Sequence, residues 1–210
     1  MGYNMAIIAF LSQKGGVGKS TLARAFACEA KKSGLSIKLA DLDTQQGTVS
    51  EWHRHRLNNG NDPVGSVEVF GKVRDALELA DSFDILILDG APRASTATLE
   101  IAKVADLLVL PTGASRDDLI PTVLLAHELV KKGVPPERIG IALVRVSTES
   151  EIQDANHYIT QAGHYCFNGY LPEKPAYRQA QNDGLAVTET RYKSLNERAD
   201  ELVQSITDRL

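Results

Sequence analysis

The sequence predicts an α/β fold, a doubly wound and mostly parallel sheet flanked by helices. Short apolar runs alternate with helix-like stretches along all 210 residues, as expected for repeated strand and helix units. Two of these runs, Ile85 to Leu88 and Leu107 to Leu110, are continuous rather than alternating in polarity. A strand that helices cover on both faces has this pattern, so both runs indicate a buried parallel sheet.

The elements follow one another in a regular order. Strands are expected at Ala6 to Leu11, Ile37 to Asp41, Val67 to Phe70, Ile85 to Asp89, Leu107 to Pro111, Ile139 to Val146 and Tyr165 to Tyr170. Helices are expected at Ser20 to Ser33, Val73 to Leu79, Leu119 to Lys132, Glu151 to Gln161 and Leu195 to Leu210. Gly34 and Gly133 each follow a pair of lysines, an ending typical of helices.

The composition is that of a globular protein with an ordinary core. Hydrophobic residues make up 43% of the chain and charged residues 24%, which excludes disorder and disulfide scaffolds. Cys28 and Cys166 have no metal-type spacing, so we expect a reducing, cytoplasmic setting. We expect neither a spanning helix of about 20 apolar residues nor a secretory signal. Residues 1–210 are predicted to form one domain, with residues 1–4 outside the fold.

A glycine-rich loop between the first strand and the first helix carries the strongest functional signal. It consists of Lys14, Gly15, Gly16, Val17, Gly18, Lys19, Ser20 and Thr21. The glycines let backbone N–H groups turn toward phosphates, and the helix N-terminus adds partial positive charge. The Lys19 ammonium suits the β and γ phosphates, and the Ser20 hydroxyl suits Mg²⁺. The loop therefore predicts a nucleotide site.

This loop resembles the deviant Walker A motif of the ParA/MinD family of ATPases. The ordinary phosphate loop begins with glycine at a position that is Gln13 here, and Lys14 adds a second lysine. The resemblance implies a P-loop NTPase fold of the SIMIBI type, with ATP and Mg²⁺ as cofactors. It also implies a homodimer in which Lys14 reaches the partner's phosphates, where it would stabilise charge like an arginine finger.

Three carboxylates stand at the ends of predicted strands, where open α/β sheets bind ligands. Asp41 and Asp43 end the second strand, and Asp89 ends the fourth. By resemblance, Asp43 positions the attacking water, Asp41 contacts the magnesium shell and Asp89 holds magnesium as a Walker B residue. The alternative is that Asp43 only caps a helix beginning at Thr48, and that Asp89 is likewise a helix cap.

The resemblance extends over almost the whole chain from Met5. It is strongest to the short, ParF-like plasmid members, on Asp89 to Ala91 and Val49 to Trp52. Arg145 stands where many relatives have an asparagine on the adenine side, so it is a predicted cofactor-binding residue. The resemblance further implies nonspecific DNA as a partner, with Arg178, Arg191, Lys193 and Arg198 as candidate contacts. The net charge of −4 is not that of a strongly basic DNA-binding protein, although local patches remain open.

Two other features of the sequence have the residue types of a binding site. His53 to Arg56 is the densest basic cluster, and we interpret it as a solvated helix face rather than a metal site. An apolar stripe runs along the last helix, from Leu195 through Ala199, Leu202 and Ile206 to Leu210. That helix is acidic on its polar side, so it is expected to pack on the sheet rather than on an anionic membrane.

The favoured function is that of a ParA-type, Mg-ATP-dependent, dimerising ATPase that segregates or positions a cargo. A plasmid is the foremost cargo, with a ParB-like adaptor that stimulates slow hydrolysis, and higher polymers of the ATP form stay open. The protein would associate with the nucleoid when ATP-bound. One alternative is a MinD-like membrane-associated positioning ATPase. Another is a metabolic P-loop ligase of the dethiobiotin synthetase type, which Lys14 and the Asp41/Asp43 pair do not favour.

Overall fold

The structure is a computed structural model that describes residues 5–91 and 96–210. Its strands are β1 (Ala6–Phe10), β2 (Ile37–Asp41), β3 (Ser66–Val69), β4 (Ile85–Asp89), β5 (Leu107–Thr112), β6 (Ile139–Val146), β7 (Tyr165–Cys166) and β8 (Leu171–Pro172). They form one eight-stranded sheet in the order β3-β2-β4-β1-β5-β6-β7, and β8 pairs with β6 off this path. Every pairing between described strands is parallel, which confirms the predicted fold class.

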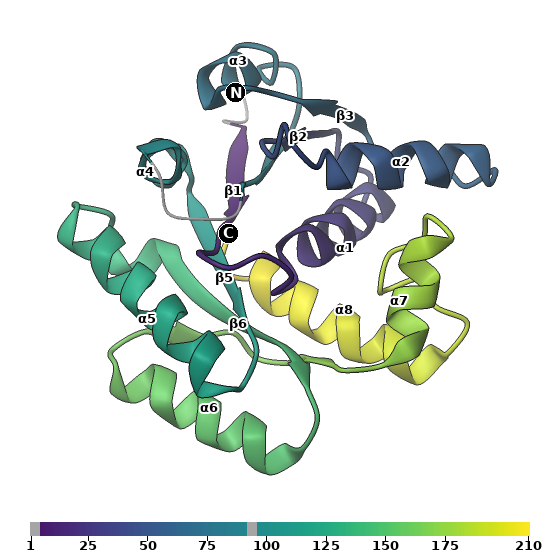
Figure 1. Cartoon of the computed structure of the whole chain (residues 1–210). Helices are drawn as coiled ribbons and strands as arrows, with labels where there is room; N and C mark the ends of the chain where they lie inside the picture. The colour runs from purple at the N-terminus through teal and green to yellow at the C-terminus, as the bar shows by residue number, and fades with distance from the viewer. Residues whose placement is uncertain (1–4, 92–95) are drawn as a thin grey trace.

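Helices cover both faces of the sheet (Figure 1). One layer contains α1 (Lys19–Lys32), α2 (Thr48–Asn58), α7 (Pro175–Asn182) and α8 (Lys193–Thr207). The opposite layer contains α3 (Val73–Glu78), α4 (Thr96–Val104), α5 (Arg116–Lys131) and α6 (Glu149–Gln161). A short 3₁₀ helix, η1 (Pro136–Arg138), leads into β6. The two apolar cores lie between these layers and the sheet, so the central strands are buried on both faces.

The predicted pattern holds best at the centre of the sheet. All residues of β2, β4 and β5 are buried, as the continuous apolar runs of β4 and β5 predict. β1 lies between β4 and β5, and its carboxyl end faces the loop that leads into α1. The strand order reverses direction at β1, because β4 lies on one side of it and β5 on the other. The carboxyl end of β1 is therefore the expected place for a ligand.

Several predicted boundaries are wrong near the edges. The expected strand from Tyr165 to Tyr170 is two short strands, β7 and β8, and β8 pairs with β6 beyond an irregularity in register. The helix α5 begins at Arg116 rather than Leu119 and includes Pro121 near its start, where a proline removes only one helix hydrogen bond. The helices α4 and α7 were not predicted.

The last helix packs through most of its predicted apolar stripe, but it ends at Thr207 and the predicted last residue of the stripe, Leu210, is exposed. Ala199, Leu202, Val203 and Ile206 of α8 are buried in the core shared with α1. Among residues 5–91 and 96–210, we find no helix with the length and apolar character needed to span a membrane. Cys28 and Cys166 are buried free thiols, and burial raises the pKa of both.

Candidate functional site

The glycine-rich loop joins β1 to α1 at the centre of the sheet. Gly16 and Gly18 have φ angles of 77° and 93°, in the left-handed region that favours glycine. A side chain at Gly18 would also come within 3.2 Å of Val144 on β6. These glycines therefore let the loop turn tightly against the sheet and present its backbone toward the start of α1.

Lys19 and Ser20 begin α1 and meet Asp89 at the end of β4. The Ser20 hydroxyl donates a hydrogen bond to Asp89 Oδ2 at 2.6 Å. Lys19 is only 7% exposed; burial lowers its pKa, while Asp89 and Asp43 act in the opposite direction. The lysine is thus held in a partly dry position beside two carboxylates, where its charge acts strongly on a bound anion.

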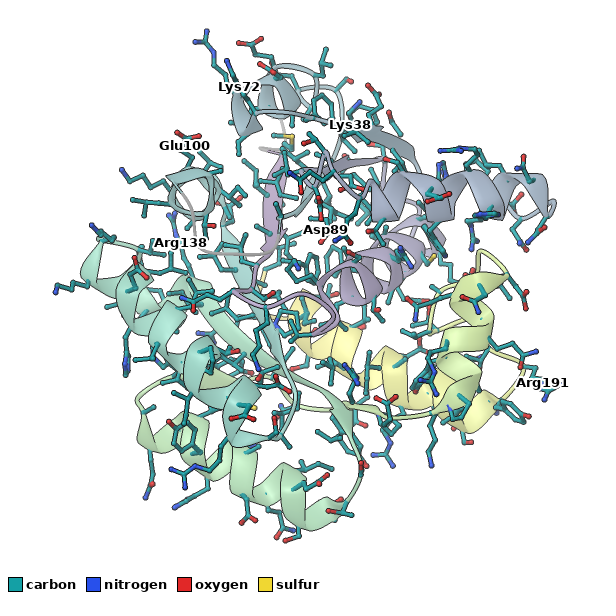
Figure 2. All side chains as sticks on the ribbon, viewed as in Figure 1. Lys38, Lys72, Asp89, Glu100, Arg138 and Arg191 are labelled. Carbon is teal, nitrogen blue, oxygen red and sulfur yellow. The ribbon has the colours of Figure 1, made fainter. Side chains whose placement is uncertain are left out.

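Asp89 is buried at the centre of the molecule (Figure 2). Its Oδ1 atom has no hydrogen-bond partner among the described residues. Burial raises the pKa of Asp89 to about 7, although the Ser20 hydrogen bond and the Lys19 charge lower it in part. A buried carboxylate oxygen beside a serine hydroxyl is the kind of oxygen donor set that Mg²⁺ prefers.

Asp41 lies beside Asp89 in the sheet, because the two residues pair across β2 and β4. Asp41 is fully buried, and its Oδ2 accepts from the Val49 and Ser50 N–H groups at 2.9 and 3.3 Å. These N–H groups lie in the first turn of α2, where backbone N–H groups have no partner within the helix. Both these free donors and the positive end of the helix dipole favour a carboxylate. Asp41 therefore caps α2. The sequence suggested such a cap only as the alternative role of Asp43.

Asp43 instead shapes the turn between β2 and α2. Its Oδ1 accepts from the Gln45 and Gln46 N–H groups at 3.2 Å, and its own N–H donates to Asp41 Oδ1 at 3.1 Å. The side chain is half-buried rather than enclosed. The alternative that Asp43 caps the helix beginning at Thr48 is wrong, because Asp41 supplies that cap. The catalytic role of Asp43 and the magnesium role of Asp41 stay predictions.

Lys14, at the start of the loop, has a partly exposed side chain, whereas Lys19 is buried. Its Nζ atom forms an ion pair with Asp118 Oδ1 at 2.8 Å, and Asp118 also accepts from the Ser115 hydroxyl at 3.1 Å. Burial would raise the pKa of Asp118, but Lys14 and Ser115 outweigh it and the pKa is lowered. Asp118 was not among the predicted site residues, because it lies in the first turn of α5 rather than at the end of a strand.

Arg145 lies between two cavities on either side of the loop. Its φ of 57° is the only left-handed value of a non-glycine residue in the described chain. Its Nε donates to Glu173 at 2.9 Å and its Nη1 to the Gly16 carbonyl at 3.1 Å. The first cavity, about 340 Å³, includes Thr21, Tyr177 and Gln181 in its lining; the second, about 450 Å³, includes Lys14 and Asp118.

The structure therefore gathers most predicted site residues at one end of the sheet. Lys19, Ser20, Asp41, Asp43 and Asp89 converge there, and Lys14 and Arg145 flank them. All four DNA candidates, Arg178, Arg191, Lys193 and Arg198, are exposed. Arg178 lies on α7 in the lining of the first cavity and shares Glu173 with Arg145, whereas Arg191, Lys193 and Arg198 lie on α8 or in the segment before it. Figure 2 shows Arg191 at the periphery.

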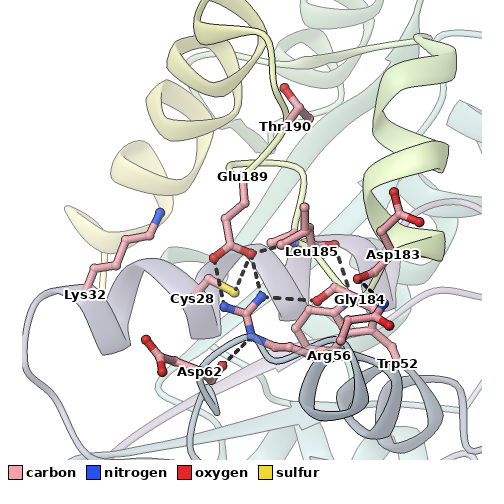
Figure 3. A network of polar contacts seen from close by, with 12 residues as sticks. Cys28, Lys32, Trp52, Arg56, Asp62, Asp183, Gly184, Leu185, Glu189 and Thr190 are labelled. Carbon is pink, nitrogen blue, oxygen red and sulfur yellow. Dashed lines mark hydrogen bonds and ion pairs between the residues drawn. The ribbon is translucent and has the colours of Figure 1, made fainter.

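The basic cluster on α2 is not the solvated face predicted. His53 and Arg56 are buried, whereas Arg54 and His55 are exposed. Arg56 forms a two-armed ion pair with Glu189 at 2.7 and 2.9 Å (Figure 3), and its Nε donates to the Asp62 carbonyl at 2.6 Å. Glu189 follows Arg56 by more than one hundred residues, so no local pattern could reveal the pair.

Comparison with known proteins agrees with this geometry. Residues 8–187 match the family described as CobQ/CobB/MinD/ParA nucleotide binding domain. The chain is 27% identical over 197 residues to maintenance of carboxysome distribution protein A of Gloeobacter kilaueensis, covering 91% of this chain and 88% of that one.

Two solved structures share the fold. The septum site-determining protein MinD of Pyrococcus horikoshii, complexed with Mg-ADP, has a TM-score of 0.74 and 16% identity, over 97% of this chain and 96% of that one. A variant of McdA from Cyanothece in complex with ATP has a TM-score of 0.71 and 18% identity, over 98% of both chains. Because the family match spans most of its length, the chain belongs to the CobQ/CobB/MinD/ParA family of nucleotide-binding domains.

Proposed function

We propose that this protein is a Mg²⁺-dependent, ParA-type ATPase that dimerises with ATP, binds DNA nonspecifically and positions or segregates a cargo. The convergence of Lys19, Ser20 and Asp89 carries the proposal, since the Ser20 hydroxyl lies 2.6 Å from a buried Walker B carboxylate. The relatives with Mg-ADP and with ATP support these ligands. The names of two relatives, for carboxysome distribution and septum site determination, support a positioning role.

In this proposal the residues of the inner site divide the work. Backbone N–H groups from Gly15 to Ser20 and the Lys19 ammonium bind the phosphates. Ser20 and Asp89 would hold Mg²⁺, which supplies charge neutralisation at the phosphates when bound, and Asp41 would contact its shell. Asp43 orients the attacking water and polarises it, because its carboxylate lies at the same strand ends as Asp89. Arg145 and Thr21 contact the nucleoside side.

Lys14 supplies the proposed contact between subunits. Its side chain is 43% exposed and forms an ion pair with Asp118. An exposed ion pair contributes little, on the order of 1 kcal/mol or less. The phosphates of a partner's ATP offer more negative charge than one carboxylate, so Lys14 exchanges Asp118 for them when two ATP-bound protomers meet.

The proposed DNA surface comprises four exposed cations: Arg178 of α7, Arg191 before α8, and Lys193 and Arg198 of α8. Each of these cations has a nearby polar or acidic neighbour: Arg178 with Glu173, Lys193 with Glu197, and Arg198 with Glu201 lie 3.6 to 3.9 Å apart. DNA phosphates would have to compete with these acids. We therefore propose that one protomer binds DNA weakly and that the ATP dimer, which doubles the number of cations, binds it usefully.

The two alternatives receive less support. A MinD-like membrane role would use an amphipathic C-terminal helix, but the apolar side of α8 is already buried against α1. A ligase of the dethiobiotin synthetase type shares the fold without needing Lys14. We propose that a ParB-like adaptor stimulates hydrolysis and that the protein is cytoplasmic, associated with the nucleoid when ATP-bound, with a plasmid as the foremost cargo.

Co-sedimentation tests this proposal directly. The protein is mixed with nonspecific plasmid DNA, or with anionic lipid vesicles, in ADP or in a slowly hydrolysed ATP analogue with Mg²⁺. We expect DNA binding only with the ATP analogue, falling at least tenfold between 50 and 200 mM salt (these concentrations are roughly those over which phosphate contacts weaken). If the protein sediments with vesicles and not with DNA, the membrane-associated alternative is supported. If it binds neither, the ligase alternative is supported.

A further inference from the structure

Arg24 is a buried arginine that none of the motifs uses. It lies in α1, little more than one turn after Ser20, and is 7% exposed. Its guanidinium is 5.2 Å from the centre of the Trp52 ring, and burial lowers its pKa to about 10 against the charges of Asp89 and Asp41. Burying a guanidinium is costly unless its hydrogen bonds are made, so its partners indicate what it does.

Arg24 connects two parts of the site. Its Nη2 donates to the Thr48 carbonyl at 2.7 Å, at the first residue of α2. Its Nη1 donates to Gln181 Oε1 at 3.2 Å, and the same oxygen accepts from the Thr21 hydroxyl at 3.0 Å. A continuous chain of contacts thus runs from Thr21 through Gln181 and Arg24 to Thr48.

At the Thr48 end, this chain fixes the segment that carries Asp43. Residues 42–47 join β2 to α2, and Asp41 holds the start of α2 through the Val49 and Ser50 N–H groups. Arg24 holds the same start from the other side, through the Thr48 carbonyl. Asp41 and Arg24 thus both hold the start of α2, to which the segment carrying Asp43 leads. Arg24 is the one of these two residues that also bonds to Gln181 of α7.

At the Thr21 end, this series of contacts reaches the first cavity. Thr21 and Gln181 are both among its lining residues, and Gln181 Nε2 donates to the Tyr177 carbonyl within α7 at 3.3 Å. A nucleoside in this cavity would contact the side chains that hold Arg24. The Thr21, Gln181 and Arg24 hydrogen bonds therefore connect this cavity to residues 42–48. A ligand that moves Thr21 or Gln181 would also affect the contact between Arg24 and Thr48.

We propose that Arg24 and Gln181 are positioning residues that tie the placement of Asp43 to the filling of the first cavity. The nucleoside then raises kcat as well as tightening binding. This inference rests on the proposed ATPase function and on the role of Asp43 in it. Through this coupling the site would distinguish a full nucleotide from a bare polyphosphate.

Steady-state kinetics with two substrates tests the inference. The full chain is assayed with Mg-ATP and with magnesium tripolyphosphate, which lacks the nucleoside. We expect kcat for ATP to exceed kcat for tripolyphosphate about tenfold in the wild type. Gln181→Met should bring kcat for ATP down to the value for tripolyphosphate. The kcat of this variant for tripolyphosphate should stay within twofold of the wild-type value. Arg24→Met should slow both substrates, and Arg24→Lys should restore part of the loss.

Gln179→Met is the matched control, because Gln179 lies on α7 with its side chain exposed. It should behave as the wild type. Hydrogen exchange of residues 42–48 provides a second measurement without turnover: ATP should slow it more than tripolyphosphate does, and Gln181→Met should abolish that difference.

Three results would overturn the inference. A Gln181→Met protein with a raised KM but unchanged kcat would make Gln181 a binding residue only. Equal slowing of both substrates by Gln181→Met would make it a general structural residue, and unaltered kinetics would give it no role. A wild-type protein that binds neither substrate would overturn the proposed function itself, which is a separate outcome.

Discussion

The inner and outer halves of the candidate site are built from different kinds of contact. The inner half consists of the buried residues Lys19, Asp41 and Asp89 and the half-buried Ser20, and its carboxylates are held by the first turns of α1 and α2. The outer half, made of Lys14, Asp118, Arg145 and Glu173, consists of ion pairs whose side chains are 31 to 61% exposed.

This difference bears on what each half can do. Buried groups keep one geometry and have strong electrostatic effects, because water does not screen them. Exposed pairs exchange partners at little cost. The inner half is therefore suited to holding one nucleotide within a protomer, and the outer half to forming contacts that appear only when a second protomer arrives.

The largest effect is expected from Lys19→Ala in the inner half. This change removes the buried cation beside Asp89 and Asp43, so the phosphates lose their main charge partner. Binding of a fluorescent ATP analogue should fall at least a hundredfold. Lys31→Ala, an exposed change on the same helix, should bind normally. If Lys19→Ala binds as the wild type does, the phosphate loop has been assigned wrongly.

Asp43→Ala should separate binding from hydrolysis. In the proposed function the half-buried Asp43 side chain positions water and does not hold the phosphates, so ATP binding should change less than threefold. Hydrolysis should fall about a hundredfold or more, as measured by phosphate release. Asp41→Ala gives the contrast: loss of the α2 cap should cost about 1 kcal/mol or more in the free energy of unfolding. Normal turnover in Asp43→Ala would remove its catalytic role.

Lys14→Ala tests the outer half. The monomer should bind ATP within threefold of the wild type, because Lys19 and the loop backbone remain. The ATP-dependent dimer should weaken about tenfold, measured by light scattering, and hydrolysis should fall with it.

A mixing experiment adds a sharper readout to Lys14→Ala. In a mixed dimer with Asp43→Ala, the Asp43→Ala subunit supplies Lys14 to a partner whose Asp43 is intact. Part of the hydrolysis should therefore return, although each parent alone is inactive. Normal dimerisation of Lys14→Ala together with no recovery on mixing would rule out the contact between subunits.

The smallest effect is a dependence of stability on pH in the inner half. Because the pKa of Asp89 is raised from 3.8 to about 7, the folded protein holds this proton more tightly than the unfolded chain. Stability should therefore fall as pH rises from about 4 to about 7 and stay lower above it. Without nucleotide, the Tm of the wild type should drop a few degrees more between pH 5 and pH 8 than that of Asp89→Asn. Parallel curves for the two proteins would contradict the raised pKa.

The inner half could be predicted from sequence because each of its residues belongs to a local pattern. The observed bounds of Ile85–Asp89 and Ile37–Asp41 match the predicted ones. In Ile85–Asp89 a continuous apolar run ends in an acid, and this pattern marks the end of a buried strand. The phosphate loop was predictable for the same reason. What the pattern could not give was the role of Asp41 as a helix cap, which depends on how tightly the chain turns after β2.

The missed features depend on contacts between distant parts of the chain. The helix α7 is short and rich in glutamine and asparagine, so tertiary contacts rather than propensity hold it. Arg56 looked like a surface residue because its partner, Glu189, lies in a loop that only the folded chain brings near (Figure 3). Asp118, likewise, becomes a partner of Lys14 only when β1 and β5 lie side by side.

The central place of β1 in the sheet also sets the order of events during synthesis. β1 leaves the ribosome before the other strands of the described sheet, yet Ala6 pairs with Ile85 and Ile8 pairs with Leu107. At about 5 to 20 residues per second, the first of these partners appears roughly 4 to 16 s later. During that interval the Ala6–Phe10 segment, which ends up between two other strands, is an unpaired apolar strand. The nascent chain must therefore pass through a long period in which its future centre is the segment most open to aggregation and to chaperones.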